Sequence, residues 1–254
     1  MTLGLPLSTM LAFVLVLARV AGLVAFLPIP GFKGAPAPIR IVLSFAITIS
    51  LFPVWPSLAN ELPALGEIAA WMFAEAGFGI VAGLAVAFLN EAFQLGAQIL
   101  SVQAGYGYAS TIDPSSQADS GVLQVMMTMV TGLLFFTTGF DRQLIRVLAA
   151  SFEKFPAGSW APSMMSLDGI VHLGSGMFSL GVRLAMPVIA LLLLIDLALA
   201  MLGRMQQQLQ LLTLAFPVKM LAALAILAAL APVTARIFQS ASARTISALI
   251  QMIR

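Results

Sequence analysis

Residues 178–202 read FSLGVRLAMPVIALLLLIDLALAML, and this stretch decides which class of fold the chain can adopt. Two of its side chains, those of Arg183 and Asp196, carry a formal charge. A helix needs about 20 mainly apolar residues to cross the hydrocarbon core of a bilayer. Backbone polar groups in lipid must be paired within the segment itself, which excludes an isolated strand. The stretch therefore predicts a membrane-spanning helix.

The composition extends this conclusion from one stretch to the whole chain of 254 residues. Hydrophobic residues make up 61% of it and charged residues 9%, and the mean hydropathy is +1.04. Soluble domains carry about 25% charged residues. The 12 basic and 10 acidic side chains are too few to cover a surface in water. The chain is thus predicted to be an integral membrane protein in contact with lipid, and a large soluble catalytic domain is excluded.

The same length criterion predicts six spans in all. The other five are residues 5–27, 39–58, 67–89, 121–140 and 211–233. We therefore expect an all-α, polytopic membrane protein with about six long hydrophobic helices arranged as hairpins. No repeat or soluble insertion interrupts the pattern, so residues 1–254 are predicted to form a single membrane domain. Within it, residues 90–120 are predicted to form an amphipathic helix extension followed by a loop.

Several classes of chemistry find no support in the sequence. Cysteine is absent and His172 is the single histidine, so thiolate and multi-histidine metal sites are excluded. No nucleophile and base stand at a catalytic spacing, which argues against an enzyme. Gly105 and Gly107 resemble a nucleotide-binding loop only weakly, because no βαβ unit surrounds them. No basic patch indicates nucleic acid. We expect no cofactor.

Ionisable residues inside apolar spans are costly and usually meet a partner or a cavity. Asp196 and Lys219 lie at equal distances from the turn between the last two spans. If these spans form an antiparallel hairpin, the two side chains face each other. We therefore predict an intramembrane ion pair that locks two helices, with a proton-relay role for Asp196 as the alternative. Arg19, Glu75 and Arg183 are the further ionisable residues in the predicted spans.

Two patterns in the third predicted helix indicate what its faces contact: one a neighbouring helix, the other water. Gly79 and Gly83 form a small-residue pair of the kind that lets two helix backbones approach closely. Beyond residue 89 the apolar character becomes one-sided, because every third or fourth residue is polar. A polar face that lines a pore is therefore predicted at these positions: Glu91, Gln94, Gln98 and Ser101.

The loop that follows this helix contains the sequence GYGYASTIDPSSQ, residues 105–117. Its glycines allow movement, Asp113 and Pro114 are typical of a turn, and no Lys or Arg is present. Such a loop can block a hole, or it can be an ordinary surface loop, and the residues alone leave both interpretations open. The residues that would form a plug are Gly105, Tyr106, Gly107, Tyr108, Ile112, Asp113 and Pro114.

At the level of motifs, the chain resembles the FliR/SctT family of type III secretion over its whole length. The first motifs are LARVAG at residues 17–22, LPIPG at 27–31 and PAPIR at 36–40. The most specific ones are QLGAQ at 94–98 and GYGYASTIDP at 105–114. IDLAL at 195–199 and LAFPVK at 214–219 complete the match, whereas QQQLQ at 206–210 departs from the family pattern.

The resemblance implies a structural subunit of a protein-export gate and no enzyme. In this family one chain joins FliP, FliQ and FlhB at the flagellar basal body in the bacterial inner membrane. The loop after the third helix acts there as a plug, and the exported substrates are unfolded flagellar proteins. The alternatives are an injectisome gate subunit and a secondary transporter. A transporter would predict an inverted repeat and substrate groups at the membrane midplane, and the sequence indicates neither.

Overall fold

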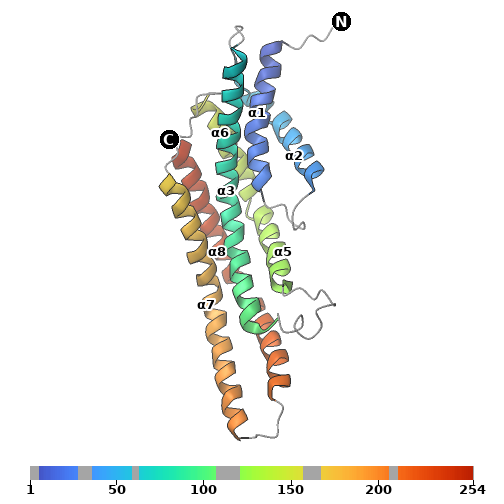
Figure 1. Ribbon diagram of the computed structural model, residues 1–254, viewed down its shortest axis with the longest axis vertical. Coiled ribbons are helices and arrows are strands. Elements are labelled where there is room, and N and C mark those ends of the chain that lie inside the picture. Colours follow the sequence, from blue (N-terminus) through green and yellow to red (C-terminus); the bar gives the residue numbers. More distant parts are fainter. Residues whose placement is uncertain are drawn as a thin grey trace. The chain divides into compact units, whose positions relative to one another are not determined.

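The computed structural model describes residues 6–27, 36–58, 63–106, 121–156, 167–205 and 211–253. These residues form helices without any strand among them, which confirms the predicted all-α class. Figure 1 shows the elements in chain order along the colour bar. They are α1 (Leu7–Phe26), α2 (Ala37–Ser50), η1 (Phe52–Val54), α3 (Leu65–Ala104), α5 (Val122–Thr137), α6 (Phe140–Lys154), α7 (Leu167–Met205) and α8 (Leu211–Ile253).

The number of helices able to span a membrane is smaller than the predicted six. Among the described residues α1, α3, α7 and α8 are long and apolar enough, and the bent pair of α5 and α6 adds a fifth if it forms one span. The predicted span at 39–58 is instead α2, a helix of 14 residues that gives way to η1. Pro53 has no N–H for the helical ladder, and its ring clashes with the preceding turn. Helix α2 therefore stops short of the length that a span requires.

Helix α3 is longer than one span, with 40 residues. The third predicted span thus continues past residue 89 as one helix to Ala104.

The chain divides into two compact units. The first comprises Met1–Leu89, Phe135–Leu173 and Ala241–Arg254, and the second comprises Asn90–Leu134 and Gly174–Ser240. A single membrane domain over residues 1–254 stays a prediction.

In the first unit, α1 crosses α3 at a contact between glycines. An added Cβ at Gly22 would lie 2.5 Å from the carbonyl oxygen of Ala76. A Cβ at Gly83 would lie 2.7 Å from the carbonyl oxygen of Leu23, and one at Gly79 would overlap the carbonyl oxygen of Arg19. The absence of side chains thus lets the two backbones touch. Figure 1 shows α1 between α3 and the short α2 in this unit.

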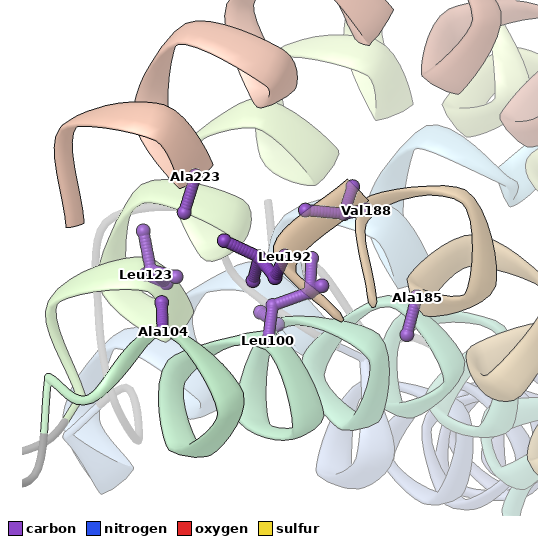
Figure 2. Close-up of a cluster of buried hydrophobic side chains, with 8 residues drawn as sticks. Leu100, Ala104, Leu123, Ala185, Val188, Leu192 and Ala223 are labelled. Carbon is purple, nitrogen blue, oxygen red and sulfur yellow. The ribbon is translucent and has the colours of Figure 1, made fainter. Parts of the chain in front are cut away.

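The second unit is built around a cluster of buried apolar side chains that joins four helices. Figure 2 shows Leu192 of α7 directed toward Leu100 of α3 and Leu123 of α5. The full buried set is Ala97, Leu100, Ala104, Leu123, Ala185, Val188, Leu192 and Ala223. Small residues alternate with large ones in this set, so the helices interlock at close range. Through this cluster α7 and α8 are fixed against the last turns of α3.

Candidate functional site

The hairpin of α7 and α8 brings Asp196 and Lys219 together. Lys219 Nζ lies 3.0 Å from Asp196 Oδ1 and donates a hydrogen bond of 3.0 Å to Oδ2. The Asp196 side chain is 39% exposed and that of Lys219 is 14% exposed. The lysine is therefore mostly enclosed by its own unit, while the carboxylate lies at the surface of the hairpin.

The predicted polar stripe on α3 is divided by the structure. Glu91 and Gln98 are exposed, whereas Ser101 is 2% exposed and lies inside the second unit. Gln94 is half-buried, and its amide lies 2.7 Å from the Thr128 Oγ1 of α5 in a hydrogen bond. Two members of the stripe are thus available to line an aqueous surface, and the other two lie where α3 packs within its unit.

The first two residues of the predicted plug lie at the end of α3, in contact with α8. Gly105 has φ +83°, a conformation that favours glycine, and the ring of Phe216 packs where a Cβ would stand. The Tyr106 hydroxyl donates a 3.2 Å hydrogen bond to the Met220 carbonyl oxygen. Burial raises the pKa of the Tyr106 phenol above its ordinary value of 10.0, so the group stays a donor at neutral pH. Gly107, Tyr108, Ile112, Asp113 and Pro114 lie outside the described residues.

The first unit contains a buried charge cluster whose pairing was not among the predictions from the sequence. Arg19 of α1 and Glu75 of α3 form an ion pair, and both side chains are 0% exposed. Arg19 Nη1 also donates to the Ser151 Oγ of α6 at 2.8 Å, and Nη2 donates to the Phe155 carbonyl oxygen at 3.2 Å. One guanidinium therefore joins three helices, through the fork of donors that arginine offers and lysine lacks.

Two aromatic rings complete the surroundings of Arg19. Its guanidinium carbon lies 4.8 Å from the ring centroid of Phe78 and 4.2 Å from that of Phe152. Rings at such distances attract a cation, more strongly where water is excluded. The available signal in the sequence was the presence of two opposite charges, Arg19 and Glu75, in separate apolar spans.

Among the described residues, no group of three or more His, Cys, Asp or Glu side chains is placed to hold a metal ion. What these residues offer is packing and charge pairing. They include a buried ion pair, an ion pair that is partly exposed at the surface, and two residues after α3, Gly105 and Tyr106, that contact α8. These features define the class of protein as a polytopic all-α membrane protein whose polar groups join helices to one another.

Comparison with known proteins supplies the particular family within that class. The profile of the bacterial export proteins, family 1, matches residues 10–245. The flagellar biosynthetic protein FliR of Escherichia coli (strain K12) is 31% identical over 220 residues, which cover 86% of this chain and 84% of the relative. The chain belongs to this family of bacterial export proteins.

Two more distant relatives indicate the breadth of the family. The flagellar biosynthetic protein FliR of Caulobacter vibrioides is 26% identical over 215 residues, or 84% of this chain and 86% of the relative. The Yop proteins translocation protein T of Yersinia pestis is 24% identical over 172 residues, covering 65% of this chain and 66% of the relative. The flagellar relatives thus match a larger share of the chain than the Yersinia protein does.

Proposed function

We propose that this chain is a structural subunit of the flagellar type III protein-export gate, in the bacterial inner membrane at the flagellar basal body. The observation that carries the proposal is the similarity to flagellar FliR, which extends over most of both chains. The described residues are compatible with it, because their polar groups serve contacts between helices. The chain helps to form and to close a channel for unfolded flagellar proteins, and it has no catalytic role.

The partners that we propose are FliP, FliQ and FlhB. The apolar surfaces of α7 and α8 support an assembly, because little of these two long helices is buried within the chain itself. The test is to express the chain with FliP and FliQ and to isolate it through an affinity tag in mild detergent. We expect all three proteins to elute as one complex. Elution of this chain alone, from membranes that contain the other two, would contradict the proposal.

An injectisome gate subunit is the second candidate, because of the similarity to the Yersinia protein. The two candidates differ in the substrates that the gate exports. A deletion of the gene should abolish motility and export of flagellar subunits if the first proposal is right. Retained motility together with the loss of other secreted proteins would favour the injectisome instead.

Closure of the channel is proposed for residues 105–121, of which 107–120 lie outside the described residues. The support comes from the composition of the loop and from its described start. No Lys or Arg ties this segment to phospholipid headgroups, while Tyr106, Tyr108 and Ile112 provide apolar bulk. At its start, Gly105 and Tyr106 are held against α8. In this proposal α8 supports the start of the plug, and the distal part of the plug closes the lumen.

A further inference from the structure

The hairpin surface around Asp196 combines one charge with a broad apolar surface. Leu193, Leu197 and Met201 of α7 are between 54% and 62% exposed. Their spacing of four residues places them along one side of the helix. Asp196 follows Leu193 by three residues, so it lies next to Leu193 at the edge of the same side. We call this surface, formed by Leu193, Asp196, Leu197 and Met201, the Asp196 face.

Neither lipid nor water suits the Asp196 face. Hydrocarbon would cover the leucines, but a charged carboxylate in contact with lipid is costly. Water would solvate the carboxylate, but it would leave a large apolar patch exposed. A cover that suits both is an apolar helix that carries one polar group at the level of Asp196.

The ion pair with Lys219 leaves the Asp196 carboxylate able to accept further hydrogen bonds. A carboxylate offers about four acceptor positions, and an ammonium group has three hydrogens to donate. Lys219 approaches from the enclosed side, with 14% of its side chain exposed, while 39% of the Asp196 side chain is exposed. A second donor can therefore reach Asp196 from outside without displacing Lys219.

We propose that the Asp196 face docks against an apolar helix of another subunit of the export gate, which presents a cation or a neutral hydrogen-bond donor to Asp196. This inference rests on the proposed function and adds to it the chemistry of one contact between subunits. Asp196 then has two roles, since it pairs with Lys219 inside the chain and accepts a hydrogen bond from a neighbour.

Exchanging the two charges separates these roles. The variant Asp196→Lys with Lys219→Asp retains an ion pair inside the chain but turns a cation toward the neighbour. We expect the purified chain to unfold at nearly the temperature of the wild type. The amount of FliP and FliQ that co-purifies should fall about tenfold or more, the effect expected for one charge-assisted hydrogen bond. Glu153→Gln, which removes an exposed carboxylate from α6, serves as the control and should leave co-purification unchanged.

A second variant covers the case in which the exchanged pair does not fold. Asp196→Leu with Lys219→Met removes both charges at similar volume, a change that buried pairs often tolerate. It too should lose FliP and FliQ, because no acceptor remains for the donor of the neighbour. Normal co-purification of either folded double variant would overturn the inference. Failure of the wild-type chain to co-purify would instead count against the proposed function, and against this inference with it.

Labelling tests whether water covers the face. The chain contains no cysteine, so Leu197→Cys introduces a single thiol. In the assembled gate this thiol should resist a membrane-impermeant maleimide, because a helix covers it. Rapid labelling in the assembled gate would place the face in an aqueous lumen and overturn the proposal.

Discussion

At the scale of single residues, the stability of the first unit depends on how Arg19 is neutralised. The guanidinium is fully buried, and its contacts with Glu75 and Ser151 replace the water that it loses. A buried charge without its partner is strongly destabilising, whereas loss of both partners is tolerated better. The Arg19–Glu75 pair is therefore expected to respond very differently to single and to double substitution.

We predict that Glu75→Gln lowers the free energy of unfolding by about 3–5 kcal/mol, because the charge of Arg19 then has no counter-ion. The double variant Arg19→Met with Glu75→Leu should lose less than Glu75→Gln alone. The measurement is thermal or denaturant unfolding of the purified chain in detergent micelles. Equal losses in the single and double variants would show that the charges are not coupled.

The glycines of the crossing between α1 and α3 give a second prediction at this scale. An added Cβ at Gly79 would overlap the backbone of Arg19, whereas one at Gly66 meets nothing within 4 Å. Gly79→Ala should therefore destabilise the chain by about 1–3 kcal/mol, as overpacking does. Gly66→Ala, in the same helix, should stabilise it by up to about 1 kcal/mol through helix propensity. Melting temperatures of the two variants, measured side by side, would reveal any departure from these opposite signs.

At the scale of elements, the end of α3 is tied to α8 by the Tyr106 hydroxyl. Because burial raises its pKa, this phenol stabilises the fold below pH 10, and the contribution is lost as the pH rises further. The chain has two tyrosines, so tyrosinate absorbance can follow them. We predict that Tyr108→Phe leaves a tyrosine that titrates above the ordinary pKa. A titration of that variant at the ordinary value would contradict the assignment.

The segment proposed as the plug gives a further prediction. Deletion of residues 107–120 should make the membrane permeable to ions or small solutes, because the proposed plug is removed while the helices remain. Asp113→Ala should matter less, since the expected task of Asp113 is to shape the turn before Pro114. The measurement is solute entry into cells in which assembly of the complex has been verified. Unchanged permeability of an assembled complex would exclude the loop as the seal.

At the scale of the whole molecule, the chain is expected to function only within an assembly. Among the described residues, few polar side chains are available to line a channel, and many large apolar ones are exposed on α7 and α8. Such surfaces require lipid or other subunits. We predict that vesicles containing this chain alone do not take up an unfolded polypeptide, whereas vesicles with the full gate do. Uptake by the chain alone would contradict the prediction.

The amino-acid sequence alone determined the class of the fold and the family. Membrane-spanning helices follow from composition, because lipid gives the backbone no alternative partner. The pairing of Asp196 with Lys219 could be predicted from the sequence, because the distance of each residue from the turn determines which residues of two adjacent helices lie at the same level. In the structure, Lys219 Nζ lies 3.0 Å from Asp196 Oδ1.

Only the tertiary structure decided the contacts between distant helices. It paired Arg19 with Glu75 and added Ser151 of α6, a residue 132 positions from Arg19. Periodicity says which residues share a face, but not which helix that face will meet. For the same reason Ser101, part of a polar stripe by spacing, lies buried. Helix α2 fell short of a span because the proline at 53 ended it locally, an effect that average hydropathy does not measure.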